Sequence, residues 1–173
     1  MPHPMPREPF PDLDLPTADG GRFVLSECQP AALTMLVFYR GYHCPICRTQ
    51  LAELQDSQQR FNELGVEAVA ISMDGEERAR KAQEEWGLGE LRIGYGLSEA
   101  DARAAGLYIS GAISDKEPPR FSEPGLFLIN PDGTLYGASI QTMPFTRPPF
   151  AQLLQVLGYV TEHGYPPRGE VGA

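Results

Sequence analysis

Two cysteines separated by two residues are the part of this sequence best suited to covalent chemistry. The segment Cys44-Pro45-Ile46-Cys47 follows an apolar stretch at 33–39 and precedes apolar residues at helical spacing. The pair is therefore predicted to lie where a strand runs into a helix. Side chains three apart on a helix are about 5–6 Å from each other, so Cys44 and Cys47 can alternate between dithiol and disulfide.

The start of a helix also favours the reactive form of a cysteine. Its first turn has unpaired backbone N–H groups and the positive end of the dipole, and both stabilise a thiolate. Free cysteine has a pKa of about 8.5, and such settings lower it to roughly 3.5–7.5. Cys44 is therefore the predicted nucleophile. Pro45 suits the first helical position. His43 either supports the thiolate by carrying or relaying a proton, or is an exposed loop histidine.

Other uses of the cysteines have less support. A structural zinc site needs four ligands, and the other Cys and His residues, Cys28, His3, His43 and His163, do not form a second pair at the usual spacing. We therefore expect redox chemistry without a metal or other cofactor, rather than a zinc site or two inert cysteines. Cys28 is interpreted as a small half-buried hydrophobe, with a role as a resolving or mixed-disulfide partner left open.

Length and charge narrow the class of protein. The chain has 173 residues, which indicates one domain with a proper core, and its net charge of −9 disfavours nucleic acid and anionic membranes as partners. No window approaches the roughly 18 consecutive apolar residues of a membrane span, and residues 1–9 lack the apolar core of a signal peptide. Three cysteines do not make a secreted disulfide framework. We expect a cytoplasmic protein.

The order of the predicted elements indicates an α/β fold with mixed strand directions. We expect an extended arm at 1–11, a single domain at 12–158 and a weakly ordered tail at 159–173. The first half is predicted to contain a hairpin at 12–25, the central strand at 33–39, a helix from Cys44 to Gly65, a strand at 66–72 and a helix capped by Asp74 and Glu77. The second half is predicted to contain a strand at 91–95, a helix at 98–106, a hairpin at 126–138 and a helix between Thr146 and Gly158. Residues 110–123 are predicted to form a long loop, which is a candidate rim of the site.

Several of these segments together resemble the peroxiredoxin-like AhpC/TSA (redoxin) family of the thioredoxin superfamily. The resemblance covers roughly residues 12–158 and rests on the segments 38–48, 50–54, 68–74 and 124–133. It implies a thioredoxin-like fold, with a central mixed sheet flanked by helices and an N-terminal hairpin. It also implies thiol-dependent oxidoreductase activity, frequently the reduction of peroxides through a sulfenic acid, and a cis Pro124 that packs beside the cysteine pair.

The sequence departs from the family's Pro-x-x-x-Thr-x-x-Cys pattern. If Cys47 takes the final position, Cys44 stands in place of threonine and Arg40 in place of proline. If Cys44 takes it, Gly41 and Val37 stand there instead. The family's distant arginine is replaced by Pro124, and three arginines are candidates to act in its place or are solvated surface charges: Arg40, Arg120 and Arg147.

Three functions follow from these residues. The leading hypothesis is a dithiol–disulfide oxidoreductase in which Cys44 attacks a disulfide or a peroxide and Cys47 completes the disulfide. The second is a dedicated peroxidase recharged by a small dithiol or a thioredoxin-like reductant. The third is a non-catalytic binding module whose surface responds to oxidation. The family resemblance is also compatible with a homodimer.

Overall fold

The central strand of the protein is apolar on both of its faces. β3 (Leu33–Phe38) is buried at all six positions, as expected for a strand that is covered on both sides. It pairs in parallel with β4 (Val66–Ile71) and antiparallel with β8 (Gly125–Ile129). The computed structural model describes residues 3–172, so residues 1–2 of the predicted arm and residue 173 of the predicted tail lie outside the described residues.

β3 is the middle strand of a five-stranded sheet with the order β5-β4-β3-β8-β9. The outer strands are β5 (Arg92–Gly94), parallel to β4, and β9 (Leu135–Ile140), antiparallel to β8. The sheet therefore contains both strand directions, as predicted. The crossover from β3 to β4 runs through α1 (Pro45–Glu63), which ends before Gly65 in the left-handed conformation, with φ +75°.

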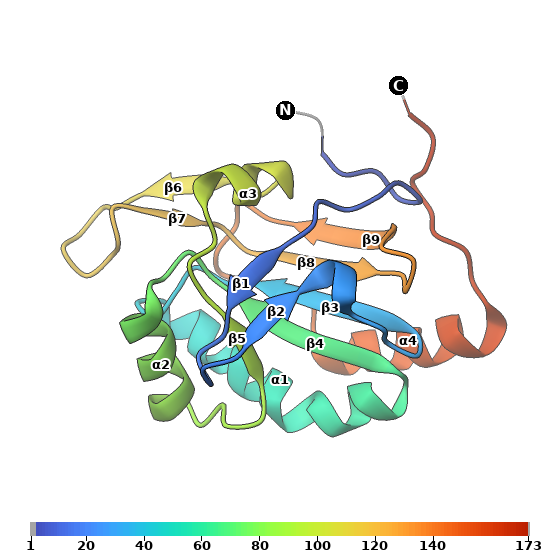
Figure 1. The fold of residues 1–173 in the computed structure, drawn as a ribbon, viewed down its shortest axis with the longest axis horizontal. Helices are drawn as coiled ribbons and strands as arrows, with labels where there is room; N and C mark the ends of the chain where they lie inside the picture. The colour runs from blue at the N-terminus through green and yellow to red at the C-terminus, as the bar shows by residue number, and fades with distance from the viewer. Residues whose placement is uncertain (1–2, 173) are drawn as a thin grey trace.

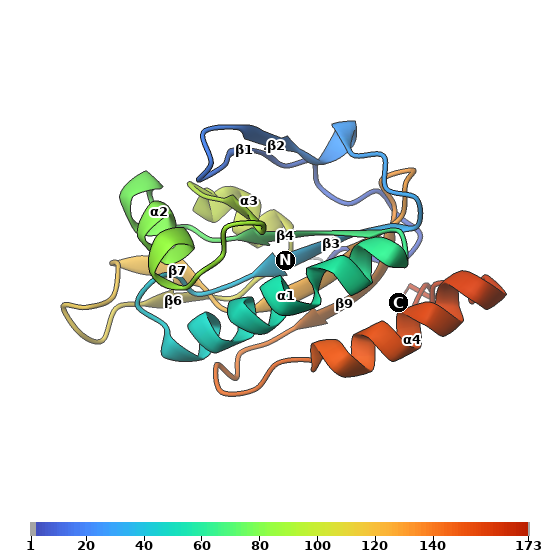
Figure 2. The same ribbon diagram turned by 90° about the horizontal axis from the view of Figure 1, so that it is seen from below.

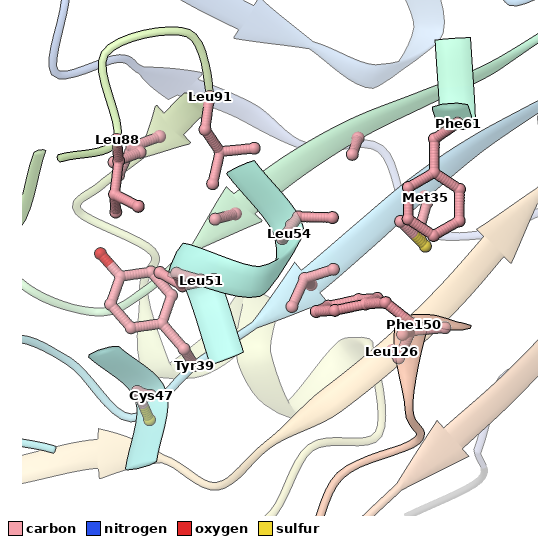
Figure 3. Close-up of a cluster of buried hydrophobic side chains, with 14 of the residues drawn as sticks. Met35, Tyr39, Cys47, Leu51, Leu54, Phe61, Leu88, Leu91, Leu126 and Phe150 are labelled. Atoms are coloured by element: carbon pink, nitrogen blue, oxygen red, sulfur yellow. The ribbon is translucent and has the colours of Figure 1, made fainter. Parts of the chain in front are cut away.

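Helices and the N-terminal hairpin cover the two faces of the sheet (Figures 1 and 2), and buried apolar side chains form one layer on each face. The first layer packs α1, α2 (Glu76–Glu85) and α4 (Phe150–His163) against one face. Figure 3 shows a part of this layer, in which Leu51, Leu54 and Phe61 of α1 point toward the strands. The second layer packs the N-terminal hairpin and α3 (Glu99–Ala104) against the opposite face.

Two small hairpins lie outside the central sheet. The predicted N-terminal hairpin is confirmed as β1 (Asp14–Pro16) and β2 (Arg22–Val24), followed by a 3-10 turn at Leu25–Glu27. The prediction of an unstructured loop at 110–123 is wrong in part, because β6 (Ile109–Gly111) pairs with β7 (Arg120–Ser122). Strands of three residues are too short to show the alternation by which a strand is recognised in sequence.

The last helix is shifted toward the C-terminus relative to its prediction. α4 begins at Phe150 rather than after Thr146, because two prolines precede it and a residue before proline is disfavoured in helical geometry. It also passes through Gly158 and ends at His163, where Gly164 takes the left-handed conformation with φ +60°. Residues 159–163 of the predicted tail are therefore helical, since an interior glycine weakens a helix by only about 1 kcal/mol.

The N-terminal arm and the C-terminal segment lie against the rest of the chain. Phe10 is buried in the second apolar layer, and Pro9 forms a bridge to Thr134 next to β9. Arg7 contacts Pro167 O and forms an ion pair with Glu170. Within residues 3–172, no helix combines the length and the apolar content that crossing a bilayer requires.

Candidate active site

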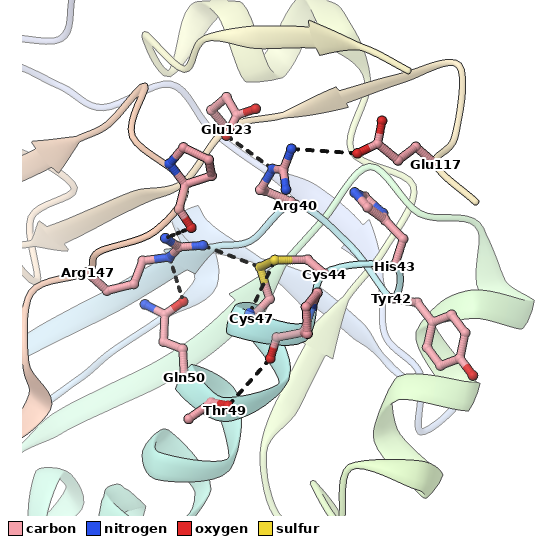
Figure 4. The surroundings of a disulfide bond; sticks show 12 residues. Arg40, Tyr42, His43, Cys44, Cys47, Thr49, Gln50, Glu117, Glu123 and Arg147 are labelled. Atoms are coloured by element: carbon pink, nitrogen blue, oxygen red, sulfur yellow. Dashed lines mark hydrogen bonds and ion pairs between the residues drawn. A yellow bond between two sulfur atoms is a disulfide. The ribbon is translucent and has the colours of Figure 1, made fainter. Parts of the chain in front are cut away.

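The cysteine pair lies at the junction between β3 and α1, as predicted. Cys44 is the N-cap residue of α1, Pro45 is the first helical residue, and the Cys47 N–H donates to Cys44 Sγ at 3.2 Å. The two sulfurs form a disulfide, with 5.2 Å between the Cα atoms (Figure 4). A helix N–H group therefore contacts the predicted nucleophilic sulfur directly, which is the geometry that stabilises a thiolate there.

Both cysteines belong to the first apolar layer. Cys44 is 2% exposed and Cys47 is fully buried, and Figure 3 shows Cys47 beside Tyr39 and Leu51. A buried site has a low local dielectric, which strengthens every charge interaction made with the sulfurs. The surroundings also admit small reactants more readily than large ones, because little of either side chain reaches the surface.

A buried carboxylate holds the loop that leads into Cys44. Asp74 accepts the Tyr42 N–H at 2.7 Å and the Arg78 guanidinium at 3.0 Å, and its side chain is fully buried. Asp74 is not the cap of α2, contrary to the prediction, because Gly75 is the N-cap residue and makes no side-chain bond. The carboxylate instead fixes the segment before the cysteines, a contact between residues more than thirty positions apart in the chain.

The loop also depends on Gly41. Its φ is +130°, and a Cβ atom at this position would lie 2.8 Å from one Asp74 carboxylate oxygen and 2.9 Å from the other. Both the backbone conformation and the close approach therefore require glycine.

Replacing Gly41 with alanine is expected to lower the free energy of unfolding by about 1–3 kcal/mol, because the substitution forces a strained backbone against the carboxylate. Urea unfolding measures the change. Gly89→Ala is the matched control, since no heavy atom of the described chain lies within 4 Å of its added Cβ and its φ is not positive. A Gly41→Ala protein as stable as the Gly89→Ala protein would contradict the proposed role of this loop.

Of the three candidate arginines, Arg147 is the one whose guanidinium contacts a cysteine sulfur. Its Nη2 donates to Cys47 Sγ at 3.5 Å, and its Nε donates to Gln50 Oε1 at 3.2 Å (Figure 4). Its Nη1 donates to the carbonyl oxygens of Pro144 and Thr146. Burial and the nearby Arg40 charge lower the pKa of Arg147. Among residues 3–172 no carboxylate pairs with this guanidinium, so its positive charge remains available to an anion at Cys47.

The guanidinium of Arg40 forms ion pairs with two glutamates. Its Nε lies 3.2 Å from Glu123 Oε2 and its Nη2 lies 3.8 Å from Glu117 Oε1, with the side chains of all three residues largely buried. The guanidinium also lies over the Phe121 ring, 4.8 Å from its centre. Arg40 therefore ties the β6–β7 hairpin to the start of the site, which agrees with the predicted position of this segment at the rim (Figure 4).

Arg120, the third candidate, lies away from the cysteines. It is exposed and pairs with Glu99 at the start of α3. The sequence placed three arginines on equal terms, and only their partners in the structure distinguish them.

His43 is half-buried next to Cys44. Its ring packs edge-on against Phe121, with 4.7 Å between the ring centres, and Arg78 Nη2 lies 3.5 Å from Nδ1. Burial, and then the Arg40 charge, lower the pKa of His43 below its ordinary value, against opposing effects of Asp74 and Glu117. The imidazole is therefore neutral near pH 7, which disfavours the charged role considered for it and leaves a role in holding or passing a proton.

Pro124 is buried at the start of β8, and Gly125 pairs with Phe38 at the end of β3 that leads to the cysteines. The expectation of a cis bond is wrong, since no peptide bond of the described residues is cis. The segment runs extended from β7 into β8, with the Glu123 N–H donating to Tyr108 O and Pro124 O accepting from the Gln141 N–H. These hydrogen bonds hold the chain extended on both sides of Pro124, whose peptide bond is trans.

Cys28 lies on the opposite side of the sheet from the cysteine pair. It packs against the second apolar layer, whereas Cys44 and Cys47 belong to the first. Its thiol donates to Val24 O at 3.5 Å, and burial raises its pKa. Cys28 is therefore a half-buried free thiol, as interpreted from the sequence, and is not a partner of Cys44 in this structure.

A groove of about 390 Å³ lies beside Arg147, and neither Cys44 nor Cys47 is among the residues that line it. It runs between the first turns of α1 and the segment before α4, and its walls include Ile46, Gln50, Phe145 and Arg147. Among the described residues, no three His, Cys, Asp or Glu side chains are grouped so that they could hold a metal ion. The arrangement suits thiol chemistry at the cysteine pair, and Arg147 is the residue that both contacts Cys47 Sγ and lines the groove.

The sheet, the helices on its two faces and a Cys-x-x-Cys pair at the start of α1 define a thiol protein of the thioredoxin superfamily. The AhpC/TSA family model matches residues 6–138, so the chain belongs to the AhpC/TSA family, within the peroxiredoxin-like branch of that superfamily.

Curated relatives and solved structures agree with this assignment. The human mitochondrial thioredoxin-dependent peroxide reductase is 25% identical over 138 residues, covering 75% of this chain and 51% of the relative. A thioredoxin peroxidase of Trypanosoma brucei rhodesiense is 25% identical over 136 residues, covering 75% of this chain and 66% of the relative. The chain thus spans one half to two thirds of the length of these two proteins.

The fold is also similar to that of solved peroxiredoxins. A cysteine-to-serine mutant of peroxiredoxin 6 from Arenicola marina superposes with a TM-score of 0.77 at 17% identity, over 91% of this chain and 74% of that one. The peroxidoxin BcpB from Mycobacterium tuberculosis superposes with a TM-score of 0.74 at 19% identity, over 91% and 99% of the two chains. At these identities the comparison establishes the thioredoxin-like fold.

Proposed function

We propose that this protein is a thiol-dependent peroxide reductase that cycles its Cys44–Cys47 pair between dithiol and disulfide. The observation that carries the proposal is the pair of donors on the two sulfurs: the Cys47 N–H on Cys44 Sγ and the Arg147 guanidinium on Cys47 Sγ. Each donor favours the thiolate of the sulfur that it contacts. The family and the names of the two relatives, a peroxide reductase and a thioredoxin peroxidase, support the same reaction.

The reaction has two oxidative steps and one reductive step. The Cys44 thiolate attacks one peroxide oxygen, so that the O–O bond breaks, a sulfenic acid forms, and the other oxygen leaves as an alkoxide or hydroxide that takes a proton. The Cys47 thiolate then attacks the sulfenic sulfur, forms the disulfide and expels hydroxide, which becomes water. A dithiol reductant returns two electrons and two protons and leaves as its own disulfide.

The neighbouring residues support these steps without reacting themselves. Pro45 starts the helix whose N–H groups face Cys44, and Pro124 lies at the same end of the sheet. Arg40 holds the β6–β7 hairpin beside the site. His43 directly precedes Cys44 in the chain, and we assign it the relay of the proton that the leaving oxygen needs. The reductant is a small dithiol or a thioredoxin-like protein, and a cytoplasmic location, where such thiols are abundant, fits this cycle.

Reduction of other disulfides is the second candidate activity, because the same pair can exchange with any accessible disulfide. The family and the two named relatives, a peroxide reductase and a thioredoxin peroxidase, favour the peroxide as the substrate. A purely responsive binding module, the third possibility, predicts no turnover with any reductant.

Thiol counting tests the proposal. The reduced protein, which has three cysteines, is treated with one equivalent of hydrogen peroxide and its remaining thiols are counted, with turnover then followed in the presence of dithiothreitol. We expect the loss of the Cys44 and Cys47 thiols, retention of Cys28, and continuous consumption of peroxide. The Cys28→Ser variant is the control and is expected to react identically. Oxidation of Cys44 and Cys47 no faster than that of Cys28 would overturn the proposal.

A further inference from the structure

The loop between β9 and α4, residues 141–149, is fixed directly beside the disulfide. It curls around the Arg147 guanidinium, whose Nη1 donates to Pro144 O at 2.8 Å and to Thr146 O at 3.0 Å. Nη2 of the same group donates to Cys47 Sγ at 3.5 Å, and Figure 4 shows the Arg147 side chain pointing toward the cysteine pair. The β9–α4 loop therefore borders the reacting sulfurs.

Two large apolar side chains of this loop are exposed to solvent. Met143 is 57% exposed and Phe145 is 72% exposed, and they flank Pro144, whose carbonyl oxygen is held by Arg147. Phe145 and the half-buried Ile46 of α1 both line the groove described above. We call Ile46, Met143 and Phe145 the loop patch. Apolar side chains that gather at the surface beside a functional group mark a place where another molecule binds.

The loop patch is preordered and carries no charge of its own. The loop contains prolines at 144, 148 and 149, each of which fixes its own φ angle, and a preordered surface loses little conformational freedom when a partner binds. The only ionisable side chain at 141–149 is Arg147, which is turned toward Cys47. In a chain with a net charge of −9, such a surface is one that an acidic protein approaches with little repulsion.

The reductive half of the proposed cycle brings the reductant to this surface. A reductant thiolate attacks one sulfur, the S–S bond breaks, and the other sulfur leaves as a thiolate that takes a proton. Arg147 stabilises negative charge on Cys47 Sγ, so Cys47 is the better leaving group and Cys44 is the sulfur attacked. The second reductant thiolate then breaks the mixed disulfide, releases Cys44 as a thiolate and leaves the reductant as a disulfide. A protein whose sulfur bonds to Cys44 necessarily contacts the residues around the pair.

We propose that the loop patch is the docking surface for a protein dithiol whose reactive cysteine stands in an uncharged apolar surface, and that this protein, rather than a small dithiol, recharges the pair. The proposal rests on the proposed function and names the reductant of the same site. Met143 and Phe145 are the main contact residues. The apolar area that they bury on docking supplies an affinity that a small dithiol does not gain.

Reduction of the oxidised protein by a purified thioredoxin and by dithiothreitol tests the proposal, with both rate constants measured by quenched flow and thiol alkylation. We expect thioredoxin to be the faster reductant per mole. The ratio of the two rate constants is expected to fall about 10-fold or more in the Met143→Ser/Phe145→Ser protein, because a few central contacts carry most of the binding energy of an interface.

The matched control is Val156→Ser/Tyr159→Ser, which also removes two exposed apolar side chains. Both lie in the second half of α4, where Gly158 is next to Leu64 at the far end of α1. This variant is expected to keep the normal ratio of the two rate constants. Circular dichroism checks the folding of each protein. If the double loop variant does not fold, Met143→Ser and Phe145→Ser are tested singly, and each is expected to lower the ratio about threefold.

The outcomes distinguish this proposal from the proposed function. A thioredoxin rate constant no higher than that of dithiothreitol, or an unchanged ratio in the loop variant, would overturn the docking surface while peroxide oxidation of the pair stands. Failure of peroxide to oxidise the pair would overturn the proposed function, whereas the ratio is still measurable on protein oxidised with diamide. Loss of self-association in the loop variant at an unchanged ratio, seen by size-exclusion chromatography, would assign the patch to a second copy of this chain instead.

Discussion

Peroxide turnover is expected to fall by about 1000-fold or more when Cys44 is replaced by serine, because a hydroxyl cannot replace the thiolate as the attacking group. The structure makes this variant a clean test, since serine is close in size to cysteine and is itself a favoured N-cap residue that can accept the Cys47 N–H. The fold and α1 should therefore be retained. Peroxide consumption with dithiothreitol as reductant measures the effect.

The Cys47→Ser variant is the informative counterpart. It should consume its first equivalent of peroxide at close to the normal rate and form a sulfenic acid, which a sulfenic-acid probe detects, and it should then lose disulfide-dependent turnover. The assignment would be contradicted if the Cys44→Ser protein still formed a sulfenic acid and the Cys47→Ser protein did not. Cys47 would then be the nucleophile. That outcome would match the frame in which Cys47 takes the final position of the family pattern.

The second large effect is expected at Arg147. Replacing it with methionine removes the charge that lies 3.5 Å from Cys47 Sγ while keeping an apolar side chain of similar reach. An opposite charge at such a distance shifts a titration by about 1–3 pH units in general, so its loss lowers the thiolate population at neutral pH about 10-fold or more. We expect disulfide closure and peroxide turnover to slow by the same factor.

Arg48→Met is the matched control for this variant. Arg48 follows Cys47 directly and carries the same charge, but its side chain is exposed. Stopped-flow measurement of closure across pH separates a change in thiolate population from loss of folding, because the rate lost in Arg147→Met should recover as pH rises. Equal rates in the two variants at neutral pH would show that Arg147 does not support the reaction.

The sequence was sufficient for the parts of the site that depend on neighbours in the chain. The apolar run before Cys44 and the helical spacing after it predicted the strand, the helix and the cysteine pair between them. The glycine that ends α1 was also predicted, because a left-handed residue after a helix has a strong local signal.

The parts that failed depend on tertiary contacts. Asp74 has the spacing of a helix cap relative to Glu77, yet its carboxylate binds the Tyr42 N–H from a distant loop. An aspartate can cap a helix or, when buried, accept a hydrogen bond from a distant loop. The sequence alone does not distinguish these two roles of Asp74. Arg147 lies in an irregular segment with no period, and only its partners in the fold distinguish it from Arg40.

The separation of Cys28 from the pair by the sheet has a consequence for oxidation of the folded chain. Three thiols allow three alternative pairings, and a chain that explored them all would accumulate scrambled isomers. Here the central sheet separates Cys28, on one face, from Cys44 and Cys47, on the other. Within one native chain, Cys44 and Cys47 are therefore the two cysteines that can form a disulfide without crossing the sheet.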